Sequence, residues 1–256
     1  MSERAILSRR GVIAGAAAGA GTLLLSGCDR LTQSPGVRQV LLGAEDWHRG
    51  AQRALGGRQA LAREFAESQM SPLFRANGNA EVADPAYQRH AASGFAQWRL
   101  TVDGLVRRPL ALPLTALQAI EQRAQITRHD CVEGWSAIGK WQGPRLGHVL
   151  DLAGLLPQAR YVVFHCADSF GAAPYYESID LIDAFHPQTI LAWRMNDRPL
   201  PIAHGAPVRL RVERQLGYKH AKYVMRIEAR ASLAGLYGGK GGYWEDAGDY
   251  HWYAGI

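Results

Sequence analysis

The chain has 256 residues, of which 47% are hydrophobic and 20% are charged. A chain of this length and composition can bury a sizeable core, so we expect a globular protein of one large domain or two small ones. The formal net charge is +6, but Lys and Arg are scattered among Asp and Glu without a long basic run. This distribution argues against a nucleic-acid partner.

The N-terminus, residues 1–27, has the pattern of an export signal. Arg9 and Arg10 precede an uncharged stretch ending at Gly27, which is too short and too rich in Gly and Ala for a transmembrane helix. The run from Ser8 to Ile13, SRRGVI, resembles a twin-arginine signal, which exports folded proteins. We therefore expect a periplasmic protein. The alternative is a membrane anchor that stays attached.

The signal ends in Leu25-Ser26-Gly27-Cys28, which resembles a bacterial lipobox. Acylation of Cys28 would anchor the protein to the membrane through several acyl chains, and Asp29 resembles a signal for retention at the inner membrane. The alternative is an ordinary cleaved signal with an incidental cysteine. We interpret residues 28–44 as a tether and residues 45–256 as a single domain with an N-terminal helical segment.

The first elements of the domain are predicted from hydrophobic periodicity. Residues 45–69 are rich in Ala, Leu, Glu and Gln and predict one or two amphipathic helices. Residues 71–85 contain prolines and an Asn-Gly pair, which predicts a loop. Apolar and polar residues alternate from Trp98 to Asp103, which predicts a half-buried strand. A short helix is expected over 114–121.

Further elements follow in the second half of the chain. The extended run 125–130 leads into a loop at Cys131, and the apolar spacing over 145–156 predicts a helix. The other predicted elements are a strand at 161–166, a loop at 167–174, a helix capped by Ser178 and stopped by Pro187, and strands at 189–194, 206–215 and 223–231.

The order of these elements predicts the fold class. Strands and short helices intermix without a regular βαβ rhythm. We therefore expect an α+β fold with mixed, mostly antiparallel strands.

Two cysteines, Cys131 and Cys166, remain after Cys28. In an oxidising compartment they could form a disulfide, but a count cannot say whether two thiols meet in space. From the residues alone, Cys131 could also be a core thiol, a metal ligand or a nucleophile paired with His129.

Several ordered motifs carry a family resemblance over residues 70–256. They are HDCVEGWSAIGKWQG, HPQTILAW, GAPVRLRVERQLGYKHAKYVMRIE and GGYWED. Together they resemble the sulfite oxidase superfamily of molybdopterin oxidoreductases, and within it the catalytic subunits of bacterial periplasmic methionine sulfoxide reductases. The resemblance implies the sulfite-oxidase-like fold and a molybdenum-molybdopterin cofactor.

In that family one cysteine ligates molybdenum, and Cys131 falls at its position. A deprotonated, soft thiolate suits this metal, so the resemblance makes Cys131 the metal ligand and the catalytic residue. The cofactor's phosphate needs fixed cations and N–H groups. The positions around its tail fall on Arg209, His220, Ala221 and Lys222. The alternative for these residues is a solvated basic face.

Other cofactor contacts are implied by weaker matches. LFRANG resembles the loop around the pterin and places Arg75 and Asn77 on it, although an Asn-Gly turn with an exposed arginine explains the segment equally well. Cys166 and His204 stand where the periplasmic reductase has a threonine and an asparagine. The alternative for Cys166 is a small apolar residue within its strand.

The segment after Cys131 bears on the substrate. Sulfite oxidases carry arginines there, whereas this chain has Val132-Glu133-Gly134-Trp135, which disfavours an anionic substrate. Trp135 and Trp141 could line a pocket for an uncharged S-oxide or N-oxide, or pack in the core. We therefore expect oxygen-atom removal from a small molecule.

The C-terminal tail leaves no room for the dimerisation domain of sulfite oxidases, and no haem motif is present. We therefore expect a monomeric catalytic subunit that receives electrons from a membrane cytochrome b. The aromatic tail suggests either a close-packed strap or a docking surface. The rival functions are a thiol enzyme using Cys131 and His129, and a lipoprotein that binds without catalysis.

Overall fold

The computed structural model describes residues 34–57 and 59–256. The chain divides into two compact units between Ala51 and Gln52. The predicted signal peptide, 1–27, and the predicted lipidation site, Cys28, lie outside the described residues. Within the part of the chain that is described, no helix has the length and apolarity needed to cross a bilayer.

The first helix, α2 (Pro35–Gly56), differs from the helix predicted over 45–69. It begins within the segment that we interpreted as a tether and ends at Gly56. Residues 60–66 are not helical and lead to a single turn of 3-10 helix, η1 (Glu67–Gln69). The prediction of helix was therefore wrong for most of the second half of 45–69.

Tertiary pairing explains why this segment is extended despite its helix-forming composition. The backbone N–H of Phe65 donates to the carbonyl of Ile126 at 2.9 Å, which aligns the segment beside a strand. The Gln188 side chain accepts from the Ala62 N–H at 2.8 Å and donates to the Ala62 carbonyl at 2.9 Å. Such long-range bonds override weak helix propensity.

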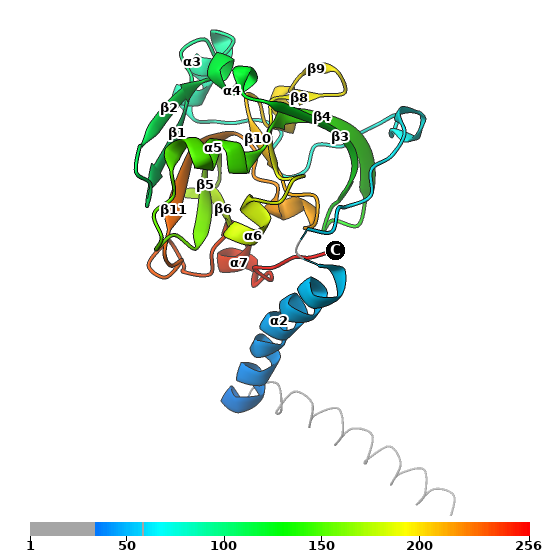
Figure 1. Cartoon of the computed structure of the whole chain (residues 1–256), viewed down its shortest axis with the longest axis vertical. Coiled ribbons are helices and arrows are strands. Elements are labelled where there is room, and N and C mark those ends of the chain that lie inside the picture. Colours follow the sequence, from blue (N-terminus) through cyan, green and yellow to red (C-terminus); the bar gives the residue numbers. More distant parts are fainter. Residues whose placement is uncertain (1–33, 58) are drawn as a thin grey trace, which may run out of the picture. The chain divides into compact units, whose positions relative to one another are not determined.

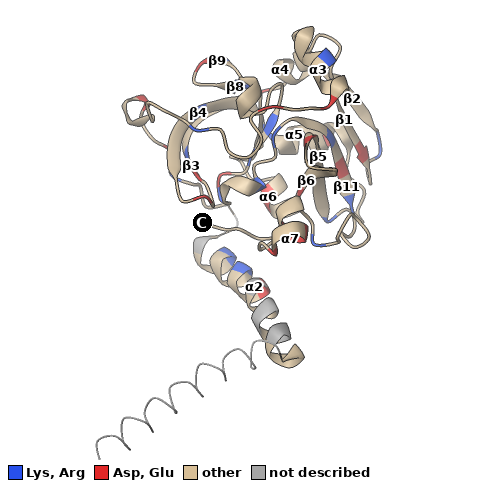
Figure 2. Ribbon diagram, turned by 180° about the vertical axis from the view of Figure 1, so that it is seen from behind, with Lys and Arg blue, Asp and Glu red and all other residues tan. Residues whose placement is uncertain are grey.

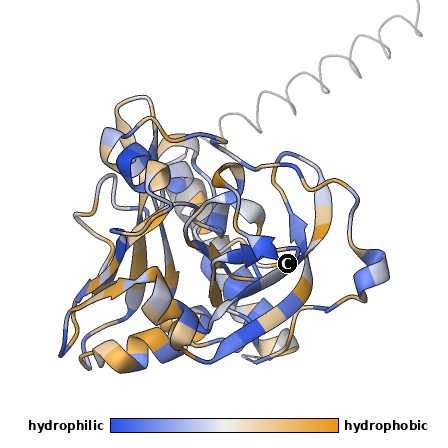
Figure 3. Ribbon diagram, turned by 90° about the horizontal axis from the view of Figure 1, so that it is seen from above, coloured by the Kyte–Doolittle hydropathy of each residue, from blue (hydrophilic) through white to orange (hydrophobic). Residues whose placement is uncertain are grey.

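A five-stranded sheet is the largest sheet in the described part of the second unit (Figure 1). Its strand order is β2-β1-β11-β5-β6, with β1 and β11 parallel and the other neighbours antiparallel. The strands are β1 (Arg99–Gly104), β2 (Leu110–Pro113), β5 (Tyr161–Phe170), β6 (Ala173–Asp180) and β11 (Val224–Arg230). The strand ribbons carry both hydrophobic and hydrophilic residues (Figure 3), and buried positions alternate with less buried ones along β1.

The main core lies on this sheet. Leu100, Val102, Phe164 and Ile227 are fully buried there, together with Leu150 of helix α5 (Leu146–Ala153). The apolar spacing of α5 places Leu146, Val149 and Leu150 in the same cluster. The strands predicted at Trp98–Asp103, 161–166 and 223–231 and the helix predicted at 145–156 are thus confirmed, with small shifts of their ends.

A second sheet has the order β3-β4-β8-β9. Its strands are β3 (Gln122–Asp130), β4 (Ser136–Pro144), β8 (Arg194–Met195) and β9 (Arg198–Pro199). The long, curved β3–β4 hairpin is visible in Figure 1. A separate pair joins β7 (Ile190–Ala192) to β10 (Arg209–Arg211). The strand predicted over 206–215 is therefore reduced to three residues.

The remaining helices are short. They are α3 (Pro85–Ala92), α4 (Leu114–Ala119), α6 (Leu181–Ala184), α7 (Tyr243–Gly248) and the 3-10 turns η2 (Ile202–His204) and η3 (Gly217–Lys219). Two local predictions are corrected. Residues 167–174 belong to a β5–β6 hairpin, and Asp180 caps α6 in place of Ser178, accepting from the Asp183 N–H. The α+β class with mostly antiparallel strands is confirmed.

Candidate functional site

A cavity of about 440 Å³ lies among loops from both sheets and from the C-terminal segment. This volume is typical of small-molecule and cofactor sites. Four of the predicted site residues line it: Asn77, Cys131, His220 and Lys222. The other lining residues are Gly78, Asn79, Val132, Glu133, Asp168, Phe170, Tyr175, Tyr218, Trp244 and Tyr250.

Cys131 lies at the turn that joins β3 to β4, as the sequence predicted. Its N–H donates to the Trp135 carbonyl at 2.9 Å, and its carbonyl accepts from the Gly134 N–H at 3.0 Å. Gly134 has a φ of 86°, a conformation that only glycine adopts at low cost. This tight turn holds a largely buried cysteine at the edge of the cavity.

The two thiols are both free, so the alternative of a Cys131–Cys166 disulfide is wrong. Burial raises the pKa of Cys131, the Glu133 N–H opposes this shift, and the Glu133 carboxylate adds to it. Without a metal, the thiol is therefore protonated at neutral pH. Metal binding must displace that proton.

Cys166 lies in β5 and does not line the cavity. Its Sγ lies 3.9 Å from the carbonyl of Phe164, and its side chain packs against the main core. Burial raises the pKa of this thiol as well. Its surroundings fit the alternative of a small apolar residue.

His129 is not arranged as the base of a thiol enzyme. It is fully buried, and its Nδ1 accepts from Arg211 at 3.0 Å. Burial, followed by the positive charges of Arg211 and Arg209, lowers the pKa of His129 well below its usual value. A neutral imidazole engaged by arginine cannot stabilise a thiolate, and the raised pKa of Cys131 agrees with this.

Arg209 is buried behind the cavity, contrary to the alternative of a solvated basic face. Its guanidinium donates to the carbonyls of His204 at 3.0 Å and His220 at 3.2 Å, and to Asn77 Oδ1 at 3.4 Å. Its Nε has no partner among the described residues. Burial, with Arg211 nearby, lowers the pKa of Arg209 to about 9.

Lys222 lines the cavity and is also buried. Its ammonium donates to the carbonyls of Asn79 and of Ala203, the latter at 2.8 Å. Burial and the charge of Arg209 lower the pKa of Lys222 to about 7. Two buried cations whose pKa values are both lowered favour an anionic ligand, because a nearby anion stabilises the charged form of each.

His220 offers an acceptor to a ligand. Its Nε2 lies 3.0 Å from the Gln215 carbonyl and must carry the proton, which leaves Nδ1 as an acceptor without a partner among the described residues. Burial and then Arg211 lower the pKa of His220 well below its usual value, so the ring is neutral. The neighbouring Ala221 is buried, and its carbonyl accepts from the Leu210 N–H at 2.8 Å.

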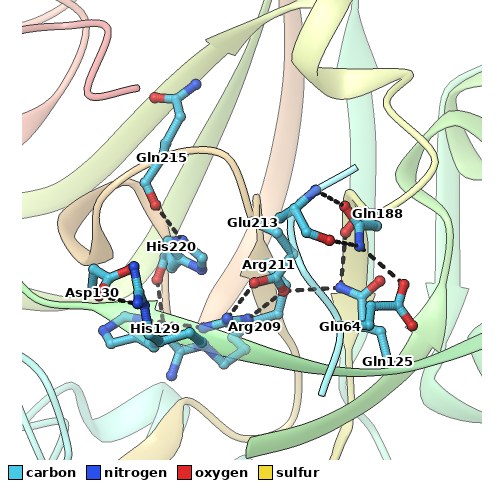
Figure 4. A network of polar contacts seen from close by, with 12 residues as sticks. Glu64, Gln125, His129, Asp130, Gln188, Arg209, Arg211, Glu213, Gln215 and His220 are labelled. Atoms are coloured by element: carbon cyan, nitrogen blue, oxygen red, sulfur yellow. Dashed lines mark hydrogen bonds and ion pairs between the residues drawn. The ribbon is translucent and has the colours of Figure 1, made fainter. Parts of the chain in front are cut away.

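A buried polar network contacts these residues (Figure 4). Arg211 and Glu213 form a fully buried ion pair with two contacts, at 2.6 and 2.8 Å. Gln125 donates to Glu213 at 2.9 Å and to the Gln188 carbonyl at 3.0 Å. Because Arg211 also reaches His129, the network fixes β3 and β10 relative to each other.

The remaining predicted residues differ in whether they line the cavity. Arg75 is exposed and does not line it, whereas Asn77 is buried and does. His204 ends η2, and its Nδ1 has no partner among the described residues. Burial and then Arg209 lower the pKa of His204 to about 4, so its ring is neutral.

The two tryptophans after Cys131 pack away from the cavity. Trp141 is fully buried in a second core cluster beneath the guanidinium of Arg211, which lies 4.4 Å from the ring centroid. Trp135 packs against that cluster and donates to Glu133 at 3.0 Å. The pocket-lining role considered for this pair is wrong.

Asp168 is the most informative residue that the sequence did not predict. It lines the cavity and is 5% exposed, and its Oδ1 has no partner among the described residues. Its Oδ2 accepts from Asn79 at 3.1 Å. Burial raises the pKa of Asp168 to about 6, against the opposing effects of Asn79 and Lys222. No local motif marks such a residue, which is defined only by the fold around it.

The observations together define a class of protein. The cavity is lined by a thiol at a rigid turn and by the buried Lys222, and a second buried cation, Arg209, contacts the lining residues Asn77 and His220. This arrangement fits an anionic cofactor held through a sulfur ligand. The family model described as an oxidoreductase molybdopterin binding domain matches residues 87–234, more than half of the chain. The chain belongs to this family and is a molybdopterin-binding oxidoreductase.

Similar proteins agree with this assignment. A protein of Azospira oryzae named "Putative protein-methionine-sulfoxide reductase subunit YedZ1" is 39% identical over 235 residues, which cover 92% of this chain and 83% of that protein. The protein-methionine-sulfoxide reductase catalytic subunit MsrP of Xanthomonas campestris is 36% identical over 141 residues, 51% of this chain and 44% of its own length. The MsrP of Gluconobacter oxydans is 36% identical over 160 residues, 57% of this chain and 50% of its own. The chain thus spans half or less of the length of these two catalytic subunits.

Among solved structures, the sulfane dehydrogenase SoxCD from Paracoccus pantotrophus is similar, with a TM-score of 0.50. The match covers 54% of this chain and 39% of that one, at 22% identity. It supports the fold alone. The predicted sulfite-oxidase-like fold is confirmed.

Proposed function

We propose that this protein is an exported molybdenum-molybdopterin reductase that removes an oxygen atom from a small S-oxide or N-oxide. The observation that carries the proposal is the position of Cys131, a solitary thiol held at the β3–β4 turn beside a cavity with buried cations. The bound cofactor would supply two-electron oxygen-atom exchange. The names of the relatives, which are methionine sulfoxide reductase subunits, support the direction of turnover.

The chain's own residues would hold the cofactor by complementary chemistry. Cys131 would supply the thiolate ligand to molybdenum, while Lys222 and Arg209 would offset the negative charge of the phosphate. The neutral His220 would accept a hydrogen bond through Nδ1, and Asn77 is fixed beside it by Arg209.

The charges at the cavity favour an uncharged substrate. Two carboxyl groups, Glu133 and Asp168, line the cavity, and the cation among its lining residues, Lys222, is assigned to the cofactor. An oxyanion such as sulfite would need fixed positive charge of its own. An S-oxide or N-oxide is dipolar but carries no net charge.

Electrons and location belong to the same proposal. Reduction of an S-oxide consumes two electrons and two protons and yields a thioether and water. We propose a membrane cytochrome b as the electron donor, in keeping with the predicted twin-arginine signal and lipid anchor at Cys28. Attachment to the inner membrane would keep the catalytic subunit next to that donor.

The test is Cys131→Ser in protein expressed in cells that make molybdopterin. The wild type should carry about one molybdenum per chain and reduce an aryl or alkyl S-oxide with a chemical reductant. The variant should fold but lose turnover, because a hydroxyl is a poor substitute for the soft thiolate ligand.

Cys166→Ser provides a matched control, since this second thiol does not line the cavity, and it should keep both metal and turnover. A wild type that carries neither molybdenum nor pterin would end the proposal. Full turnover in Cys131→Ser would also contradict it.

A further inference from the structure

Part of the cavity lining is aromatic. Phe170, Tyr175, Tyr218, Trp244 and Tyr250 line it, and we call these five residues the aromatic wall. Trp244 and Tyr250 stack with 5.6 Å between ring centroids, and Phe170 meets Trp244 edge-on at 5.1 Å. Tyr218 contacts Tyr250 at 5.1 Å, so the wall is nearly continuous.

The wall presents ring faces more than hydroxyl groups. The Tyr175 hydroxyl donates to the Tyr218 carbonyl at 2.7 Å, and the Tyr218 hydroxyl donates to the His251 carbonyl at 2.6 Å. Trp244 and Tyr250 are only half-buried, so part of each side chain remains accessible. The surface is therefore suited to apolar groups and to sulfur, which makes favourable contacts with aromatic rings.

Buried charges hold the C-terminal part of the wall in place. The Lys219 ammonium lies between the carboxyl groups of Glu177 and Glu245, and all three side chains are fully buried. Next to Glu245, the Asp246 carboxylate accepts from the Gly238 N–H at 2.9 Å and the Lys240 N–H at 3.0 Å. Helix α7 is thus fixed before any ligand binds, which lowers the cost of binding.

The wall is distinct from the residues assigned to the cofactor. A second group of ring contacts surrounds Phe74, whose ring centroid lies 5.6 Å from that of His129 and 5.8 Å from that of His204. The centroids of His129 and His220 are 5.1 Å apart. The buried cation Arg209 donates to the carbonyls of residues in this second group. Among the lining residues, His220 and Lys222 are assigned to the cofactor, whereas the five residues of the aromatic wall are not.

We propose that the aromatic wall binds the organic arm of the substrate and determines which S-oxides react, in favour of uncharged thioether oxides with extended apolar arms. This inference rests on the proposed function. The residues to test are Trp244 and Tyr250, because they lie beyond the matched family domain, which ends at residue 234. The aromatic wall thus combines three residues of the matched domain with these two aromatic residues beyond it.

The test compares two neutral substrates that differ only in their arms, dibutyl sulfoxide and dimethyl sulfoxide, on the molybdenum-loaded enzyme. The wild type should show a higher kcat/KM for the dibutyl compound. Trp244→Ala and Tyr250→Ala should each lower the ratio of the two kcat/KM values by about tenfold, a typical discrimination by an apolar pocket. Trp244→Phe, which keeps an aromatic face, should retain most of the ratio.

A binding measurement complements turnover. Dibutyl sulfone, titrated calorimetrically into the loaded enzyme, should bind wild type more tightly than Trp244→Ala. Trp252→Phe is the matched control, because Trp252 lies in the same segment but packs against Tyr161 and donates to Ser178. The ratio of kcat/KM values should be unchanged in this control.

The outcomes separate this inference from the proposed function. Suppose that wild type reduces both sulfoxides. If Tyr250→Ala and Trp244→Ala then have the same ratio of kcat/KM values as wild type and the same affinity for the sulfone, the inference is wrong. If one alanine variant fails to fold or to retain molybdenum, the other alanine variant and Trp244→Phe decide. If loaded wild type reduces neither sulfoxide, the proposed function fails, and this inference fails with it.

Discussion

Asp168 shows how the cavity controls a single ionisable residue. Its neighbours include Asn79 and Lys222, which stabilise the carboxylate, and two buried phenols, Tyr87 and Tyr223. Burial outweighs the stabilising neighbours and raises the pKa of Asp168 from 3.8 to about 6. Because the pKa is higher in the folded state, Asp168 stabilises the fold most below pH 4. That contribution is lost as the pH rises through about 6.

We therefore expect Asp168→Asn to raise the free energy of unfolding of the metal-free protein more at pH 7 than at pH 4. A shift of about two pKa units corresponds to about 3 kcal/mol, and asparagine avoids this penalty while still accepting from Asn79. Urea unfolding of both proteins at both pH values measures the difference. An equal effect at pH 4 and pH 7 would show that the carboxyl ionises freely. The exposed Asp151→Asn is the control.

At the scale of elements, helix α7 depends on one buried cation. Burial disfavours the charge of Lys219, but Glu177 and Glu245 outweigh it and raise the pKa of Lys219. Burial and then Glu245 raise the pKa of Glu177 well above its usual value, so this carboxyl is protonated. The Lys219 ammonium therefore lies beside a neutral Glu177 carboxyl.

Lys219→Met should destabilise the protein by roughly 3–5 kcal/mol, because it removes the cation from a fully buried ion pair with Glu245. Glu177→Gln is the matched variant and should cost less than about 1 kcal/mol, since the amide resembles the protonated carboxyl. Equilibrium unfolding in urea distinguishes the two. Equal stabilities would mean that the ammonium does not hold the segment.

Elements whose own residues determine their structure were predictable. The alternating strand at β1, the compact strand at β5 and the apolar stripe of α5 all appear close to the predicted places. Residues 60–66 have helix-forming residues but are extended, because Ile126 and Gln188 supply backbone bonds from distant parts of the chain. Local composition cannot report such partners.

The candidate site was predictable to the extent that motifs mark it. Cys131, Asn77, His220 and Lys222 come from recognisable motifs and meet at one cavity. Asp168, Trp244 and Tyr250 come from separate segments, and only the folded chain brings them to the same cavity. Arg209 lies behind the cavity because it faces the protein interior, which the alternation of its strand did not predict.

At the scale of the whole molecule, charge is distributed evenly. Figure 2 shows Lys and Arg interspersed with Asp and Glu over the second unit, without a continuous basic stripe. This pattern does not suggest a nucleic-acid surface. The location of the protein is predicted separately, from the export signal and the lipid anchor.

Export and anchoring can be tested separately. Replacing both Arg9 and Arg10 by Lys should retain the precursor in the cytoplasm, because the twin-arginine signal is read by its own export machinery. Cys28→Ala should instead allow export but shift the protein from the membrane fraction to the soluble periplasmic fraction. Cell fractionation with immunoblotting measures both. Periplasmic protein from the double Lys variant would contradict the predicted route.

The last residues of the chain are bonded to the loop that leads to His220. The Ile256 N–H donates to the Arg214 carbonyl at 3.0 Å, and the Leu216 N–H donates to the Ala254 carbonyl at 2.9 Å. A protein that lacks residues 254–256 would lose the backbone support of this loop while Cys131 remained intact.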